Sequence, residues 1–316
     1  MQQLKLVFMG TSAFALPVLE TIINSRHILE AVITIPDRPQ GRGYKLVPSP
    51  VKQKAEQEGF PLYQPSSLQE EDFFCALKAI SPHLLVVVDF GKMVPQELVE
   101  MASKGGINLH PSLLPYFRGP APIQRAIMAG AVKTGVSVIY LEKKMDGGDI
   151  ICQEEEAILP EDTAGDLRQR LSLKGARVLG DSIEMIASGE VSAVPQEEAL
   201  ATYAPPVEKN EARLNWEQEG KDLANIIRAL NPTPGAFTFL RGKRVKIWKA
   251  KYSPAIRGEH PGEIIEIDAS GIWVAAGKAG VLLEEVQPEG KKKMSAAEFA
   301  RGYRLEKKER FGGEGD

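Results

Sequence analysis

The sequence lacks the features that would place it in a secreted, membrane or disulfide-rich class. Among its 316 residues are two cysteines, Cys75 and Cys152, which cannot form a disulfide framework and have no metal-ligand spacing. No apolar run approaches the roughly 18 to 20 residues that a helix needs to cross a bilayer. Met1 is followed almost at once by a predicted strand, so we expect no signal peptide. These absences favour a protein of the reducing cytoplasm.

Candidate metal ligands are also scarce. The four histidines lie far apart in the sequence and have no ligand spacing: His27, His83, His110 and His260. The composition is otherwise that of an ordinary globular protein, with 43% hydrophobic and 26% charged residues. We therefore predict no bound metal, and the length allows one large or two ordinary domains.

Negative charge is in slight excess and is unevenly distributed. The net charge of −3 divides into 19 Lys and Arg against 25 Asp and Glu in residues 1–204, and 20 against 17 in residues 205–316. A mildly basic C-terminal part suits a polyanionic partner, although this asymmetry alone does not identify one.

The first 190 residues alternate short apolar runs with helical patterns. The predicted strands are residues 4–9, 29–35, 84–88, 106–109 and 135–141, and the predicted helices are residues 15–24, 50–58, 73–79, 122–129 and 164–187. This alternation is typical of an α/β protein, so we predict a Rossmann-like, mostly parallel sheet with helices on both faces. We assign residues 1–189 to this first domain.

The pattern changes after a proline-containing linker, which we place at residues 190–207. A predicted helix at 220–230 is followed by short strands separated by glycine, at residues 236–240, 245–250, 262–267, 272–276 and 281–286. This spacing predicts a small, OB-like β-barrel within a second domain of residues 208–316. We interpret the runs Glu154–Glu156 and Lys291–Lys293 as solvated faces, although the second run could contact RNA.

The most informative polar pair lies where a predicted strand opens into a loop. Asn108 and His110 are two residues apart, so on an extended chain they point to the same side, and Pro111 and Pro115 then prevent the strand from continuing. An amide can hold a carbonyl oxygen while an imidazole moves a proton at neutral pH. In isolation, a strand cap and a half-buried histidine explain the pair equally well.

In an open α/β sheet, ligands bind where the strands end, and two further loops should reach that edge. The turn Gly10–Ser12 follows the first strand but lacks the Gly-x-Gly-x-x-Gly pattern, so we do not expect NAD. The loop around Asp146 follows the strand that ends near Leu141, and a carboxylate here could orient His110 and stabilise its imidazolium form. Taken alone, Asp146 is more simply a turn residue.

Together these residues resemble the family of 10-formyltetrahydrofolate-dependent formyltransferases. The family pattern consists of Asn-x-His, Ser-Leu-Leu-Pro-x-x-Arg-Gly and Asp-x-Gly-Asp, which match residues 108–110, 112–119 and 146–149. The resemblance extends through residues 211–216 and 227–236, and so covers nearly the whole chain. It implies that residues 1–189 form a formyltransferase catalytic domain.

The resemblance also implies a chemistry and a co-substrate. Members of this family transfer the formyl group of 10-formyltetrahydrofolate directly to an amine. Asn108 would then stabilise the oxygen of the tetrahedral intermediate, and His110 would take up a proton while Asp146 holds it. The residues expected at the folate site are Asp89, Phe90, Gly91, Ser112, Leu113, Leu114, Pro115 and Leu141.

Four positions depart from the family pattern. Asp89 and Phe90 stand where members usually have a small residue and a tyrosine, Pro111 stands where many have glycine, and Thr233 replaces an expected tryptophan. A carboxylate facing the folate pocket would change folate affinity or its pH dependence, but Asp89 could equally face solvent. None of these departures affects the predicted catalytic triplet.

Two basic segments distinguish a tRNA acceptor from a small one. The glycine-hinged loop at residues 36–50 carries Arg38, Arg42 and Lys45, and it is similar to an insertion in tRNA-specific members of the family. The predicted barrel also carries a basic hairpin. Its residues expected to contact tRNA are Arg244, Lys249 and Lys251.

We therefore expect a cytoplasmic monomer that formylates the amino group of initiator methionyl-tRNA. The main alternative is a formyltransferase or formyl-folate hydrolase that acts on a small molecule, which would not need the basic loop and barrel. A non-catalytic RNA-binding protein that kept the fold is the other alternative, and the intact triplet argues against it. The sequence does not indicate how an initiator tRNA would be distinguished from an elongator.

Overall fold

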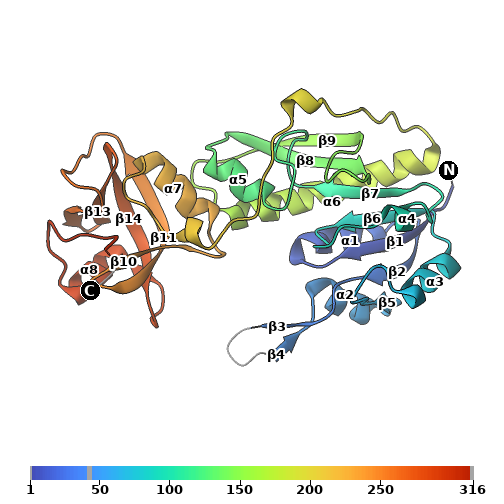
Figure 1. Cartoon of the computed structure of the whole chain (residues 1–316), viewed down its shortest axis with the longest axis horizontal. Coiled ribbons are helices and arrows are strands. Elements are labelled where there is room, and N and C mark those ends of the chain that lie inside the picture. The colour runs from blue at the N-terminus through green and yellow to red at the C-terminus, as the bar shows by residue number, and fades with distance from the viewer. Residues whose placement is uncertain (1, 41–44, 314–316) are drawn as a thin grey trace. The chain divides into compact units, whose positions relative to one another are not determined.

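The structure is a computed structural model that describes residues 2–40 and 45–313 (Figure 1). The contacts between residues divide the chain into two compact units. The first unit comprises Met1–Gly119, Lys133–Ala157 and Arg168–Ala204, and the second comprises Pro120–Val132, Ile158–Leu167 and Pro205–Asp316. Each unit therefore contains more than one segment of the chain, whereas the domain limits predicted at residues 189 and 207 divide the sequence consecutively and stay a prediction.

A mostly parallel sheet of seven strands forms the centre of the first unit. Its strands, in spatial order, are β5 (Leu62–Tyr63), β2 (Ile28–Ile33), β1 (Lys5–Gly10), β6 (Leu84–Val88), β7 (Gly106–His110), β8 (Lys133–Tyr140) and β9 (Ile150–Ala157). The first five are mutually parallel, and β8 and β9 are antiparallel to their neighbours. The apolar run of β6 is fully buried at the centre, as expected of a parallel strand covered on both faces.

Helices cover both faces of this sheet, which confirms the predicted architecture. The helices α3 (Glu71–Ile80) and α4 (Gln96–Val99) pack on the face that carries Val87. On the other face lies α6 (Ala164–Ser188), in which Gly175 closely approaches Leu109. The short helix η1 (Ala13–Ala15) and α1 (Leu16–Ile23) follow β1, and α2 (Pro50–Glu58) follows β4 (Lys45–Val47), which pairs with β3 (Arg38–Gln40).

The strand β9 was not predicted, and the interpretation of Glu154–Glu156 as a solvated face is wrong. Side chains alternate along a strand, so Glu154 and Glu156 face α6, where both carboxylates pair with Lys174 at 3.1 and 2.9 Å. These contacts hold the pKa of each carboxyl below its usual value. Glu155 faces the other way and pairs with Lys133. Three consecutive acidic residues conceal the alternation because all of them are polar.

A six-stranded antiparallel sheet forms the centre of the second unit. Its strands are β10 (Ala236–Leu240), β11 (Lys243–Ser253), β14 (Ala279–Pro288), β13 (Gly271–Ala276) and β12 (Ile264–Asp268) in spatial order, with β15 (Met294–Ser295) paired to β14. The segment at 309–312 connects its two edges. Ile264 of β12 donates a hydrogen bond to the carbonyl of Glu309, and Gly312 donates one to Phe239 of β10. The sheet is thereby closed into the predicted small barrel.

Three helices accompany the barrel. These are α5 (Pro122–Met128), α7 (Gly220–Ala229) and α8 (Ala296–Tyr303), of which α8 was not predicted. Ser295 caps α8 through the amide of Glu298, and Glu298 bonds back to Ser295. Phe299 of α8 is fully buried in the core of the barrel.

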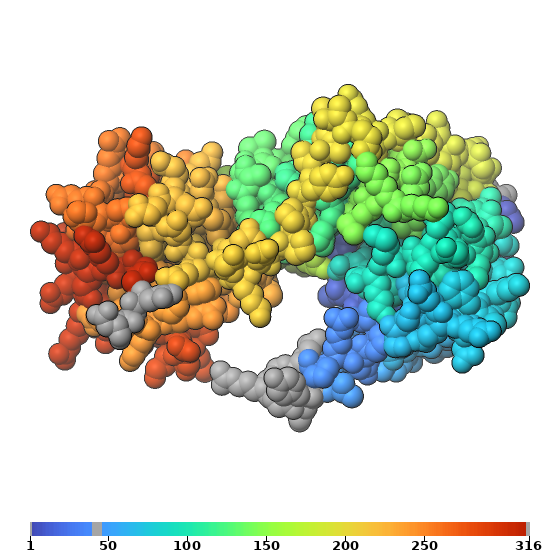
Figure 2. Space-filling view, viewed as in Figure 1, coloured from blue at the N-terminus to red at the C-terminus, as the bar shows by residue number. Residues whose placement is uncertain are grey.

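The residues after α6 form what we call the return segment (residues 194–204), which includes η2 (Glu198–Leu200). The amide of Arg118 donates to the carbonyl of Thr202 at 2.9 Å, and the amide of Ala204 donates to the carbonyl of Arg118 at 2.6 Å. At its start, Val194 exchanges two backbone hydrogen bonds with Ile150. In the space-filling view the segment, coloured yellow, lies against the green atoms of the first unit (Figure 2). This part of the predicted linker is therefore a structural element.

A buried cation fixes the return segment. The side chain of Arg118 is fully buried and donates two hydrogen bonds to Gln196 and two to Glu198, at distances of 2.7 to 3.2 Å. Hydrogen bonds from Arg118, and then from Lys144, lower the pKa of the Glu198 carboxyl from 4.5 to about 2. A buried guanidinium needs such partners because its desolvation is otherwise uncompensated.

We expect Glu198→Gln to lower the free energy of unfolding at pH 7, because the buried Arg118 loses its counter-charge. The folded-state pKa of Glu198 lies below the unfolded-state value, so its contribution is complete above about pH 4.5 and is lost as the pH falls through about 2. Urea unfolding of both proteins between pH 7 and pH 2 should show the difference disappearing over that window. Glu155→Gln, which removes an exposed carboxylate paired with Lys133, is the control. A difference that is constant across the window would contradict the assignment to this charge pair.

Candidate active site

Asn108 and His110 lie at the carboxyl end of β7 and point to the same side of the sheet. Between them Leu109 faces α6, so the two polar side chains face the side covered by α3 and α4. Asn108 is half-buried and His110 is 4% exposed. The strand thus presents an amide and an imidazole at the edge where ligands of α/β sheets bind.

Asp146 completes the triplet. Its Oδ1 lies 3.4 Å from Nδ2 of Asn108 and 3.6 Å from Nδ1 of His110. Its Oδ2 accepts a hydrogen bond from the amide of Gly119 at 2.8 Å. Asp146 is also the turn residue that its sequence context indicated, with a left-handed φ of 51° that aspartate tolerates better than most residues. The structure therefore brings the three predicted catalytic residues together, and their roles stay a prediction.

The close approach of the Asp146 loop depends on glycine at two positions. A Cβ at Gly119, where φ is 114°, would lie 2.9 Å from the carbonyl oxygen of Ala204. A Cβ at Gly148 would lie 1.9 Å from the carbonyl oxygen of Tyr140. Any side chain at either position would push apart the backbone segments that surround Asp146.

The sequence did not predict the residue that binds the backbone of this loop. Gln196 of the return segment donates hydrogen bonds to the carbonyls of Asp146 and Gly148, at 2.8 and 2.7 Å. The same side chain accepts from Arg118. Gln196 lies in a proline-containing stretch without periodicity, so no local pattern could have identified it.

The second ring nitrogen of His110 is also fixed. Nε2 lies 2.8 Å from the carbonyl oxygen of Phe117, which can only accept, so Nε2 carries the proton of the neutral ring. Nδ1 is therefore the nitrogen that can gain a proton. Nδ1 lies 3.6 Å from Oδ1 of Asp146.

The loop that follows β7 contains four of the residues predicted to contact folate. The hydroxyl of Ser112 donates to the carbonyl of Tyr116, and the hydroxyl of Ser137 donates to the carbonyl of Ser112, each at 2.6 Å. The amide of Leu114 donates to the same Ser137 hydroxyl. The loop is thus rigidly held by its own polar groups, whereas contacts of Ser112, Leu113, Leu114 and Pro115 with folate stay a prediction.

The remaining residues predicted at the folate site follow β6 and β8. Phe90 and Leu141 pack in the hydrophobic core on the α3 and α4 side. Gly91 has a left-handed φ of 82° and open space where a Cβ would lie. The carboxylate of Asp89 accepts hydrogen bonds from the hydroxyl of Ser12 and from Arg168. Asp89 is therefore exposed to solvent but paired with Arg168, and its effect on folate stays a prediction.

The basic loop predicted to contact tRNA is described only in part. Arg38 is exposed on β3, which pairs with β4 in an antiparallel hairpin. Of Lys45 the structure describes the backbone, and Arg42 lies outside the described residues. The hairpin strands were not predicted, since three-residue strands leave no readable alternation.

The three basic residues predicted on the barrel differ in their surroundings. Lys249 and Lys251 both pair with Glu161 and Glu284, at 2.9 to 3.6 Å. Arg244 is exposed and lies 3.8 Å over the ring of Phe237. A phosphate would therefore have to compete with carboxylates for the two lysines, whereas Arg244 has no such competitor in the described residues.

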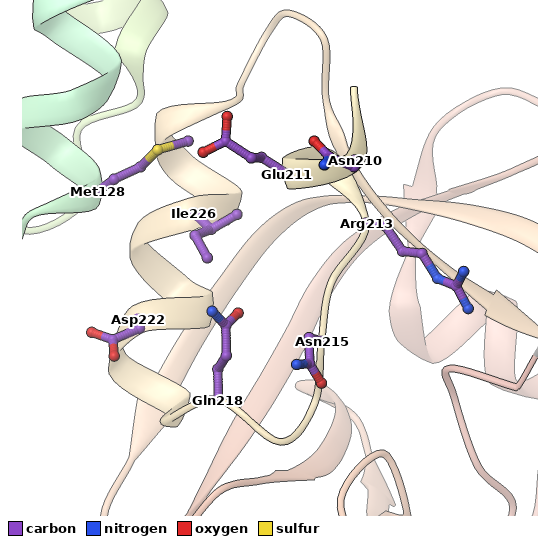
Figure 3. Close-up of a pocket in the computed structure, with 8 residues that line it drawn as sticks. All are labelled: Met128, Asn210, Glu211, Arg213, Asn215, Gln218, Asp222 and Ile226. Carbon is purple, nitrogen blue, oxygen red and sulfur yellow. The ribbon is translucent and has the colours of Figure 1, made fainter. Parts of the chain in front are cut away.

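A separate pocket of about 460 Å³ lies within the second unit (Figure 3). It is lined by Met128, Asn210, Glu211, Arg213, Asn215, Gln218, Asp222 and Ile226. Glu211, the acidic side chain nearest its upper end in the view, is bound by Arg125 at 2.6 and 2.9 Å. None of the residues predicted at the catalytic or folate site lines this pocket.

Two features are absent from the part of the chain that the structure describes. Among residues 2–40 and 45–313, no group of His, Cys, Asp and Glu side chains could hold a metal ion. No helix in the same residues is long and apolar enough to cross a membrane.

Comparison with known proteins agrees with this geometry. The formyl transferase family matches residues 4–183, and its C-terminal domain matches residues 206–304. The chain is 44% identical to methionyl-tRNA formyltransferase of Moorella thermoacetica over 95% of its length and 96% of that protein. It is 40% identical to the enzyme of the same name from Bacillus cytotoxicus, over 96% and 97% of the two chains.

Solved structures with lower identity share the fold. The N-formyltransferase of Helicobacter canadensis, in complex with folinic acid and dTDP-3-aminofucose, superposes with a TM-score of 0.64 at 19% identity over 90% of this chain and all of that one. HypX of Aquifex aeolicus, in complex with tetrahydrofolic acid, gives 0.66 at 17% identity over 98% of this chain and 49% of that one. The chain belongs to the formyl transferase family, in the group of the methionyl-tRNA formyltransferases.

Proposed function

We propose that this protein transfers the formyl group of 10-formyltetrahydrofolate to the α-amino group of initiator methionyl-tRNA. The observation that carries the proposal is the convergence of Asn108, His110 and Asp146 at the carboxyl edge of the sheet. Relatives that are 40–44% identical over nearly the whole chain are methionyl-tRNA formyltransferases, which favours this acceptor over a small amine. We further propose that the protein acts as a cytoplasmic monomer.

The reaction requires stabilisation of a developing negative charge. The unprotonated amine attacks the formyl carbon, a C–N bond forms, and the carbonyl oxygen becomes an oxyanion. Asn108 is a neutral donor fixed on a strand, so its amide can bond that oxygen without reorganising. Asp146 accepts from the same amide and thereby orients it.

A proton must leave the attacking nitrogen as the intermediate forms. His110 can accept it at Nδ1, because Nε2 is already committed to the carbonyl of Phe117. The resulting imidazolium faces the Asp146 carboxylate at 3.6 Å. Collapse of the intermediate then breaks the bond between the formyl carbon and N10 of the folate, and a proton is returned to N10.

The proposed mechanism requires that the position of Asp146 be fixed. Its carboxylate contacts the oxyanion donor, the base and the amide of Gly119 at once. A displacement of Asp146 would therefore disturb both the donor and the base. The hydrogen bonds from Gln196 to the Asp146 loop oppose such a displacement.

We expect Asn108→Ala and His110→Ala each to lower turnover by at least about a hundredfold, because an oxyanion donor and a general base act mainly in the transition state. Folate binding should largely persist. Steady-state formylation of methionyl-tRNA, together with folate binding isotherms, measures both quantities. His260→Ala, which removes an exposed histidine of the second unit, is the control. Near-normal turnover in either active-site variant would refute the corresponding role.

We also expect Arg42→Ala to weaken productive use of methionyl-tRNA while leaving folate affinity unchanged. Arg42 lies between Gly41 and Gly43, so the backbone can bring its guanidinium to a phosphate or base edge at little steric cost. The loss should shrink as salt is raised, because the contact is largely ionic.

The measurement is kcat/KM for methionyl-tRNA at low and moderate salt. Arg177 is an exposed arginine of α6 that pairs with Glu154 of β9, and Arg177→Ala controls for the loss of one positive charge. Unchanged kinetics of Arg42→Ala at both salt concentrations would remove the loop from the tRNA contacts.

A further inference from the structure

A second polar cluster occupies the carboxyl edge of the same sheet. We call Ser12, Phe14, Asp89 and Arg168 the edge cluster. The Arg168 Nη2 donates to the hydroxyl of Ser12 at 2.9 Å and to the carboxylate of Asp89, and its guanidinium lies 5.0 Å over the ring of Phe14. Two separate segments of the chain, residues 12–14 and Asp89, thus hold one arginine of α6 in place.

The edge cluster lies close to the predicted catalytic residues. Gly10 of β1 pairs with Val88 of β6, and Val87 of β6 pairs with Asn108 of β7. Asp89 directly follows β6, which lies between β1 and the strand β7 that carries His110. The edge cluster therefore lies at the same carboxyl edge of the sheet as the predicted catalytic residues.

Arg168 retains unused hydrogen-bonding capacity. A guanidinium has five N–H groups, and in the described residues the bonds of Arg168 all come from Nη2. Its side chain is 40% exposed. Nε and Nη1 can therefore donate to an incoming anion without breaking the contact with Asp89, and the ordered guanidinium loses little freedom when it does so.

Arg168 and the residues predicted to contact folate lie on opposite faces of the sheet. Phe90 and Leu141, which are predicted to contact folate, pack on the side of α3 and α4. Arg168 belongs to α6 and lies beside Phe14, on the opposite side. Asn108 and His110 face the α3 and α4 side, so an amine acceptor held by Arg168 on the α6 side would have to reach across the carboxyl edge of the sheet to meet the formyl donor.

We propose that Arg168 binds a phosphodiester at the 3′ end of the aminoacylated tRNA and is a positioning residue for formyl transfer. This inference rests on the proposed function and names one contact that would deliver the amine to His110. Asp89 and Ser12 hold the guanidinium so that its remaining N–H groups face the incoming strand. The aspartate at position 89, which departs from the family pattern, would then fix the guanidinium of Arg168 in position.

The first test is the kinetics of Arg168→Ala and Arg168→Lys on methionyl-tRNA. We expect Arg168→Ala to raise KM for methionyl-tRNA about tenfold, as for the loss of one charge-assisted contact, with kcat and the folate KM within about twofold. Arg168→Lys should recover part of the loss. The slope of log KM against log salt should fall by about 0.7 in Arg168→Ala, the value for one phosphate contact on a single strand.

Arg26→Ala is the matched control. The side chain of Arg26 is about as exposed as that of Arg168 and also pairs with a carboxylate, that of Glu184, but Arg26 lies at the amino end of β2, away from the carboxyl edge. It should leave KM and the salt slope unchanged. An unchanged salt slope in Arg168→Ala, or a loss of kcat with KM intact, would overturn the proposal. A rise in the folate KM in place of the tRNA KM would assign Arg168 to the folate carboxylates and would also overturn it.

A double-mutant cycle separates binding from a purely structural role. If Arg168 serves only to neutralise Asp89, its removal should have no effect once Asp89 is absent, so the double variant should behave like Asp89→Ala. We expect Arg168→Ala to raise the tRNA KM further in the Asp89→Ala background, since the guanidinium still contacts phosphate there. Failure of the proposed function is a different result: the unaltered protein would not formylate methionyl-tRNA at all.

Discussion

The carboxylate of Asp146 is the contact on which the rest of the site depends. It joins its own loop to the end of β7 and to Gly119 in the loop that follows β7, although Asp146 lies 27 residues or more away from both in the sequence. The contact is possible only because aspartate tolerates a left-handed backbone and because Gly119 and Gly148 lack side chains. The predicted catalytic geometry is therefore a consequence of backbone conformations at three positions.

That geometry extends outward through the return segment. Gln196 binds the backbone of the Asp146 loop and also the buried side chain of Arg118, which in turn pairs with Glu198. Arg118 belongs to the loop that follows His110. Its buried side chain therefore connects that loop, through Gln196, to the loop that carries Asp146. The consequence is that residues outside the predicted catalytic triplet hold the loop that carries Asp146. A substitution at Glu198 that touches no substrate can for this reason alter the site.

The parts that were predictable from the sequence are those with a local signal. The strand β6 is a continuous apolar run, and α2 has the predicted bounds because Ser49 and Pro50 begin it and Gly59 ends it. The pairing of Asn108 with His110 followed from their spacing, whereas Gln196 and Arg168 reach the edge only through the tertiary fold. The strand β9 was not predicted because its half-buried and exposed positions at residues 154–156 are all glutamate. The alternation of a strand is therefore not visible in the polarity of the sequence.

Charge compensation limits what a count of basic residues can say about RNA binding. Lys249 and Lys251 pair with Glu161 and Glu284, so a phosphate would have to compete with carboxylates for both lysines. A cation that is held by one carboxylate yet keeps unused donors is different, because it binds an anion without losing its first partner. By this criterion the arrangement of partners around each arginine or lysine, and not the net charge of its region, decides which of them can hold a nucleic acid.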